Sequence, residues 1–161
     1  MFTLRCTQKL LRRGLAISPA QIQPTSTLLG DWYANLVYFG PHQLILCTST
    51  KTLLPIVVTA KDARAAPIRI RAALGAVLAC LDIPGAMVDR ELAQMEEFRV
   101  DRTADRRLLS SLNEMAFLLR YEIQLHGNRS LIEHALRLAQ TPMKYILYDS
   151  PDRATRTLFS R

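Results

Sequence analysis

The chain has 161 residues, carries a formal net charge of +7, and is 49% hydrophobic. These values indicate one folded domain with a substantial core, and they exclude general disorder. The longest apolar run, residues 72–81, is too short to cross a bilayer, so we expect no membrane association. The positive charge permits nucleic-acid binding, but the basic residues are scattered along the chain, so nucleic acid is not the favoured partner.

The N-terminal region predicts a strand, a short helix and a loop. Apolar and polar side chains alternate over residues 2–6, which favours a strand. Thr7 is placed to cap a helix through Arg13, and Gly14 ends it. Residues 16–27 combine two prolines with serines, threonines and glutamines, which predicts a loop. The start of the chain is rich in arginine and has no acidic residue, a composition that transit peptides share, and this alternative stays open.

Residues 28–60 are the stretch around which we expect the rest of the chain to fold. Three runs rich in β-branched and aromatic residues are separated by turn residues, and they cover residues 32–39, 43–48 and 52–59. They predict a β-meander. Pro55 cannot donate a ladder hydrogen bond, so the third strand should lie at an edge or contain a bulge. Asp31, directly after Gly30, is interpreted as a turn former.

The second half of the chain is mainly helical in pattern. Hydrophobic spacing and capping residues predict helices at residues 67–81, 89–96, 104–126 and 130–140. The longest is capped by Thr103 in this prediction, and Ser130 with Glu133 forms a capping box for the last one. Brief strands are predicted at residues 98–100 and 145–148, before a polar, frayed tail at 151–161.

The order of these elements predicts the fold class. Strands cluster instead of alternating with helices. We therefore predict a single α+β domain over residues 1–150, with a mostly antiparallel sheet built on the central meander and several helices packed on it. Cys6, Cys47 and Cys80 are widely spaced in apolar contexts, which predicts buried, reduced thiols in a cytoplasmic protein.

Three segments together carry a family resemblance. They are residues 5–11 (RCTQKLL), residues 30–36 (GDWYANL), and Asp101-Arg102 followed by Ser110, Asn113, Ala116 and Phe117. With them the chain resembles a family of small bacterial proteins known only as a domain of unknown function. Members often have asparagine where this chain has Val100. The resemblance implies a bacterial protein and candidate positions, but no activity.

Strong catalytic motifs are absent from the sequence, which has no P-loop, dinucleotide-binding, nucleophile-elbow or HExxH pattern. Asp101 and Asp105 could act as paired carboxylates, but the favoured interpretation is that they stabilise the positive end of a helix dipole, with Arg102, Arg106 and Arg107 as adjacent partners. Asn113 lies among apolar residues of the longest predicted helix. We expect it to be buried and paired, because an unpaired buried amide costs about 1–3 kcal/mol.

We therefore predict a non-enzymatic binding or regulatory module with one small polar pocket, no cofactor and no metal. Its candidate binding residues are Arg5, Thr7, Lys9, Asp31, Trp32, Asn35, Asp101, Arg102 and Asn113. Trp32 would supply an aromatic wall, and the partner would be a small anionic ligand or an unknown protein. Two alternatives stay open. One is a hydrolase or nuclease-like enzyme using Asp31, Asp101 and Asn113, and the other is a basic nucleic-acid-binding protein.

Overall fold

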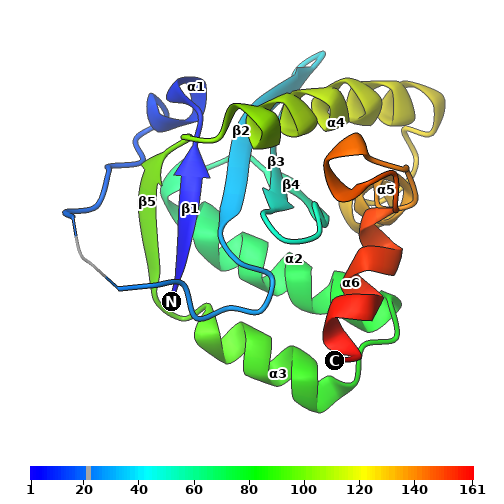
Figure 1. Ribbon diagram of the computed structural model, residues 1–161. Coiled ribbons are helices and arrows are strands. Elements are labelled where there is room, and N and C mark those ends of the chain that lie inside the picture. Colours follow the sequence, from blue (N-terminus) through cyan, green and yellow to red (C-terminus); the bar gives the residue numbers. More distant parts are fainter. Residues whose placement is uncertain (21–22) are drawn as a thin grey trace.

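A five-stranded sheet forms the centre of the computed structural model, which describes residues 1–20 and 23–161 (Figure 1). Residues 21 and 22, in the predicted loop, lie outside the described residues. The strand order is β4-β3-β2-β1-β5. The strands are β1 (Phe2–Cys6), β2 (Trp32–Phe39), β3 (His42–Ser49), β4 (Pro55–Thr59) and β5 (Phe98–Arg102).

The sheet is mixed, which corrects the prediction of a mostly antiparallel one. β2 pairs with β3, and β3 with β4, in antiparallel fashion, but β1 is parallel to both β2 and β5. Tight turns join the antiparallel strands. Long connections join β1 to β2 and β4 to β5, and they carry the chain back to the same end of the sheet, as parallel pairing requires. The α+β class itself is correct.

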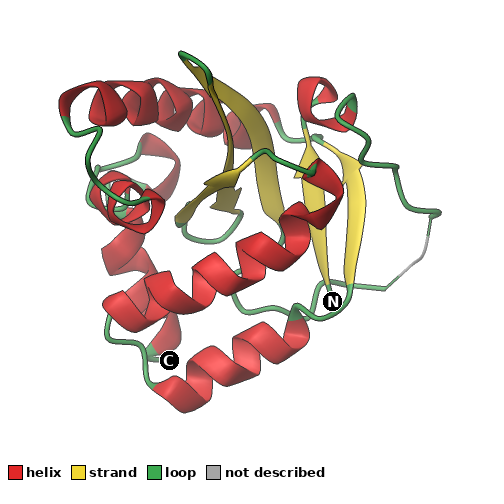
Figure 2. Cartoon of the chain, turned by 180° about the vertical axis from the view of Figure 1, so that it is seen from behind, coloured by secondary structure: helices red, strands yellow, loops and turns green. Residues whose placement is uncertain are grey.

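Helices cover both faces of the sheet. Figure 1 shows α4 crossing in front of β2 with α2 behind the strands, and Figure 2, seen from behind, shows α2 on the near side. The helices are α1 (Gln8–Leu11), α2 (Ala66–Cys80), α3 (Gly85–Gln94), α4 (Arg106–Leu125), α5 (Leu131–Leu138) and α6 (Pro151–Phe159). Two 3-10 turns, η1 (Ala63–Ala65) and η2 (Lys144–Ile146), complete the described elements. No described helix is long and apolar enough to cross a membrane.

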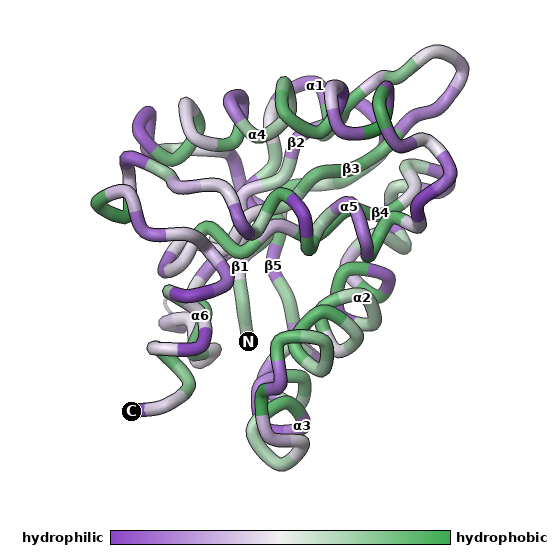
Figure 3. Tube along the Cα trace, turned by 90° about the vertical axis from the view of Figure 1, so that its right-hand side faces the viewer, coloured by the Kyte–Doolittle hydropathy of each residue, from purple (hydrophilic) through white to green (hydrophobic). Residues whose placement is uncertain are grey.

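The predicted packing of the longest helix on the sheet is confirmed. α4 contacts β2 and β3, and its side chains Leu112, Met115 and Leu119 are fully buried. Along the Cα trace, β3 and α2 are largely hydrophobic, whereas α4 alternates between hydrophobic and hydrophilic turns (Figure 3). One side of α4 therefore faces the core, and the other faces solvent.

Several predicted boundaries are wrong. α3 begins at Gly85 and not at Asp89. α4 begins at Arg106, because the Asp105 carboxylate, and not Thr103, accepts hydrogen bonds from the first-turn amides. Residues 52–54, expected to begin a strand, form a turn in which Leu53 has a φ of 56°. The capping box that opens α5 is confirmed.

The C-terminal region also differs from the prediction. No strand forms at residues 145–148. This stretch holds η2, and then Leu147 and Tyr148 with positive φ values of 57° and 62°. The expected frayed tail forms α6, in which Phe159 is buried and the Thr155 hydroxyl donates to Thr52 Oγ1 at 2.9 Å. The segment is polar in composition, but Pro151, Thr155 and Phe159 recur at a spacing of four residues and form the buried side of α6.

The buried side chains include two cysteines, Cys6 and Cys47, and one carboxylate, Glu91. Cys6 and Cys47 are buried free thiols, but Cys80 is exposed, which corrects the prediction that all three are buried. Glu91 on α3 is buried, and its carboxylate accepts hydrogen bonds from Leu28 N at 2.8 Å and Leu29 N at 3.0 Å. Burial raises the pKa of Glu91, and the two backbone hydrogen bonds only partly offset this rise.

Candidate functional site

Arg5 joins several of the predicted binding residues in one polar cluster. β1 pairs with β2 and β5 in a register that sets Arg5 beside Tyr33 and Asp101. The Arg5 guanidinium lies 3.4 Å from Asp31 Oδ2 and 3.5 Å from Asp101 Oδ2. It also donates to the Arg102 carbonyl at 3.4 Å. Residues almost a hundred positions apart in the chain therefore meet, although Asn113, which the single-site prediction also includes, does not join them.

The bonds of Asp31 indicate a structural role for this cluster. One carboxylate oxygen, Oδ1, accepts the Thr3 backbone N–H at 3.1 Å and the Thr25 hydroxyl. The other oxygen faces Arg5. Asp31 thus ties β1 to the loop before β2, and its acceptor sites are largely occupied. This is more than the local turn that the sequence predicted.

Two other pairs of residues lie further along the same strands. The Thr7 hydroxyl donates to Asn35 Oδ1 at 2.8 Å, so the Thr7 side chain does not cap α1 as predicted. The Lys9 amine lies 4.4 Å from the centre of the Tyr38 ring. Within the described chain these contacts satisfy the side chains locally and form no cavity with Arg5.

Two of the predicted residues do not belong to this group. Trp32 is fully buried, and strand alternation places its side chain on the sheet face opposite Arg5, so it supplies no aromatic wall. Asn113 is exposed on α4, where we expected it to be buried and paired. Among residues 1–20 and 23–161, no hydrogen bond joins Asn113 to Arg5 or Asp31. The prediction of a helix was right, but the side of α4 that faces the core carries Leu112 and not Asn113.

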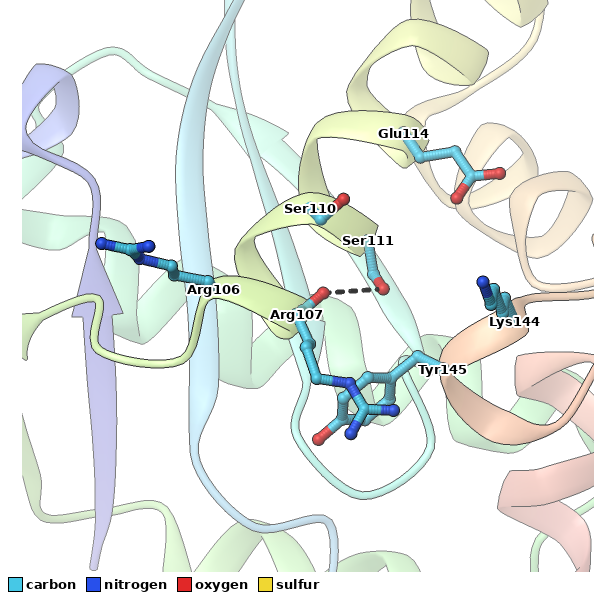
Figure 4. Close-up of a pocket in the computed structure, with 7 residues that line it drawn as sticks. All are labelled: Arg106, Arg107, Ser110, Ser111, Glu114, Lys144 and Tyr145. Carbon is cyan, nitrogen blue, oxygen red and sulfur yellow. Dashed lines mark hydrogen bonds between the residues drawn. The ribbon is translucent and has the colours of Figure 1, made fainter.

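A basic hollow, not predicted from the sequence, lies beside α4 and η2. It has a volume of about 320 Å³. Its lining residues carry three cations, one carboxylate and three hydroxyls, and they are Arg106, Arg107, Lys144, Glu114, Ser110, Ser111 and Tyr145. Figure 4 shows the Lys144 amine pointing toward the side formed by Ser111 and Glu114, while Arg106 extends away toward β1. In the part of the chain that the structure describes, none of the three cations has an ion-pair partner.

Tyr145 is the aromatic residue that lines the basic hollow. The Arg107 guanidinium lies 5.6 Å from the centre of its ring, a cation–π distance (Figure 4). Burial raises the pKa of the Tyr145 phenol, and the nearby Asp105 carboxylate raises it further against the opposing effect of Arg107. The hydroxyl therefore stays protonated at neutral pH and can donate a hydrogen bond.

The position of Arg106 and Arg107 is unfavourable for the helix itself. They occupy the first turn of α4, which contains no acidic residue after the Asp105 cap. A cation near a helix N-terminus opposes the helix dipole, at a cost of about 0.3–1 kcal/mol each. The sequence contains this signal, since Asp105 is followed directly by two arginines. Tyr145 falls in the strand predicted at residues 145–148, Lys144 lies just before it, and their approach to α4 depends on the tertiary fold.

Comparison with known protein families gives a match over most of the chain. The family model described as Domain of unknown function (DUF6933) matches residues 3–154. No curated protein and no solved structure matches the chain. The match therefore supports the resemblance to an uncharacterised family and supplies no activity, substrate or partner.

Proposed function

We propose that this chain, which belongs to the family described as Domain of unknown function (DUF6933), is a non-enzymatic binding module for a small anionic ligand. The ligand occupies the basic hollow beside α4. A cytosolic location in a bacterium is part of the proposal. It is supported by the buried free thiols Cys6 and Cys47 and by the family resemblance.

The observation that carries the proposal is the convergence of unpaired cations with hydroxyl donors. Arg107 and Lys144 come from α4 and η2, and both line a hollow of about 320 Å³. Ser110 and Tyr145 also line the hollow, with the Tyr145 hydroxyl on the Arg107 side and away from Lys144 (Figure 4). Two cations with neutral donors suit a phosphate or a compact polycarboxylate, because hydrogen bonds between charged groups are stronger than those between neutral groups. The volume is at the small end of ligand pockets, which favours a compact ligand.

The two arginines at the start of α4 also support a ligand-binding role. Two arginines at the start of α4 cost stability unless an anion is present. Proteins commonly carry such destabilising groups where function requires them.

Pyrophosphate, citrate and glycerol phosphate are suitable probes, and calorimetry and thermal unfolding are suitable measurements. We expect one of these anions to bind and to raise the melting temperature, because a ligand that binds the native state stabilises it. Lys144→Ala should weaken binding about tenfold or more, the worth of one charge-assisted hydrogen bond. Lys61→Ala is the matched control, since Lys61 is an exposed lysine outside the hollow.

Equal weakening by both lysine variants would show that only net charge matters and would contradict a site at the hollow. Tight binding of random duplex DNA that is lost on mutation of Arg106 and Arg107 would instead favour the nucleic-acid alternative. No observation favours the hydrolase alternative. Asp31 and Asp101 are held by Arg5, and Asn113 is exposed elsewhere.

A further inference from the structure

Two large hydrophobic side chains are exposed next to each other in the loop that follows η2. Leu147 is 90% exposed and Tyr148 is 68% exposed, although leucine side chains are usually buried. Isolated exposed apolar residues are common on protein surfaces, whereas contiguous exposed apolar area is typical of interaction sites. The pair in the loop of residues 143–149 is of the second kind.

The backbone of this loop indicates that the exposure is built into the fold. Leu147 and Tyr148 have φ values of 57° and 62°, in the left-handed region that bulky residues disfavour. Strain of this kind persists only where the surrounding structure fixes it, and it is concentrated at functional sites. Here the Tyr148 N–H donates to the Met143 carbonyl at 2.9 Å, and the Met143 N–H donates to the Asp149 carbonyl at 3.0 Å. Met143 is buried, so the closed loop is anchored in the core.

A second hollow, the loop hollow, adjoins this loop and is distinct from the basic hollow beside α4. It has a volume of about 320 Å³ and lies between the loop, the β3–β4 turn and α6. Cations and apolar side chains share its lining, which consists of Lys51, Thr52, Ile146, Asp149, Ala154, Thr157, Leu158 and Arg161. Within the described residues neither Lys51 nor Arg161 has an ion-pair partner, whereas the Asp149 carboxylate lies 3.4 Å from the Arg153 guanidinium. The surface beside the exposed pair therefore carries uncompensated positive charge.

We infer that the loop of residues 143–149 docks an acidic segment of a partner protein. Apolar side chains of that segment pack on Leu147 and Tyr148, and its carboxylates face the cations of the loop hollow. The net charge of +7 attracts such a partner at long range. Lys51 and Arg161 do not line the basic hollow, so this interface is independent of the proposed function.

The chemistry of this surface favours a protein over other polyanions. A lipid bilayer takes up an element with a large apolar face, and one leucine with one tyrosine offers little apolar area for insertion. Nucleic acid could stack a base on Tyr148, but Leu147, the more exposed of the two, has no comparable role in such a complex. A protein segment supplies apolar side chains and carboxylates together.

A library of random dodecapeptides displayed on phage tests the inference, with the wild-type protein as the immobilised target. We expect the enriched peptides to combine aspartate or glutamate with large apolar residues. The most enriched peptide is then synthesised with a fluorescent label, and its dissociation constant is measured by anisotropy. The affinity should fall as salt is raised, because the interface pairs opposite charges. Saturating pyrophosphate should not displace the peptide, since other residues line the basic hollow. Peptide binding without any pyrophosphate binding would refute the proposed function and support this inference.

Variants of the exposed pair locate the interface. Leu147→Asn and Tyr148→Asn should each weaken binding of the labelled peptide about tenfold or more, the effect of losing a central interface contact. Asparagine tolerates the left-handed region, so neither variant should melt below wild type. Lys51→Ala, which leaves the loop backbone unchanged, should weaken binding about three- to tenfold and reduce its dependence on salt. Ile68→Gln is the matched control, since Ile68 is 71% exposed but belongs to α2, and it should leave the affinity unchanged.

The inference is overturned if no peptide is enriched, or if the enriched peptides lack acidic residues. Equal affinity of the wild type and the two asparagine variants would also overturn it, as would displacement of the peptide by pyrophosphate. Sedimentation of the protein with vesicles of phosphatidylserine and phosphatidylcholine, lost in Leu147→Asn, would contradict it by identifying a membrane as the partner.

Discussion

Arg106→Glu should make the protein more stable and a weaker anion binder at the same time. Arg106 is exposed at the first position of α4 and lines the basic hollow. The substitution removes a cation that opposes the helix dipole and adds an anion that the dipole favours, a change of two unit charges. Since the side chain is exposed and Asp105 is an adjacent like charge, we expect a gain of only about 1 kcal/mol. For a chain of this size that corresponds to roughly 2–4 °C in melting temperature.

Arg137→Glu is the matched control. Arg137 is an exposed arginine in the last turn of α5, where a cation favours the helix dipole. The change in net charge is the same, but the expected change in stability is a loss. Urea unfolding at low salt should show opposite signs for the two variants, and both effects should shrink near 1 M salt, where the Debye length is about 3 Å. Anion binding should weaken in Arg106→Glu alone, because the substitution places a negative charge in the lining of the hollow, even though the Arg106 guanidinium itself extends away toward β1. If both variants shift stability in the same direction, the dipole argument is refuted.

Three further outcomes are expected. Leu112→Ala should lower the free energy of unfolding by about 2–5 kcal/mol, because Leu112 is fully buried, and a melt within a degree of wild type would show that the core is placed wrongly. Only Cys80 should react rapidly with a thiol reagent in the native protein. The reason is that burial raises the pKa of Cys6 to about 12 and that of Cys47 well above its ordinary value. All three thiols should react after denaturation. Glu91 has a raised pKa in the folded state, so its contribution to stability is fully present below its ordinary pKa of 4.5 and falls as the pH rises through the folded value. The stability difference between wild type and Glu91→Gln, followed by urea unfolding from acidic to neutral pH, should therefore decrease, and a constant difference would contradict the shift.

The sequence by itself determined the local elements. The alternation at β1 and β2, the capping box of α5 and the apolar face of α4 follow from side-chain spacing within a few residues, and each was found where predicted. The meeting of Arg5 with Asp31 and Asp101 was also anticipated, because segments that resemble one family suggested a shared site.

Only the tertiary structure decided how distant segments meet. The parallel pairing of β1 with β2 and β5 depends on the path of long connections. The spacing of hydrophobic residues along the sequence does not specify that path. The exposed position of Asn113 and the basic hollow depend on which side of α4 faces the sheet and on where η2 packs. The order of α6 depends on Phe159 and Thr155 finding partners far away in the chain. Local propensity acts over a few residues, whereas a site is made by burial and charge that only the folded chain brings together.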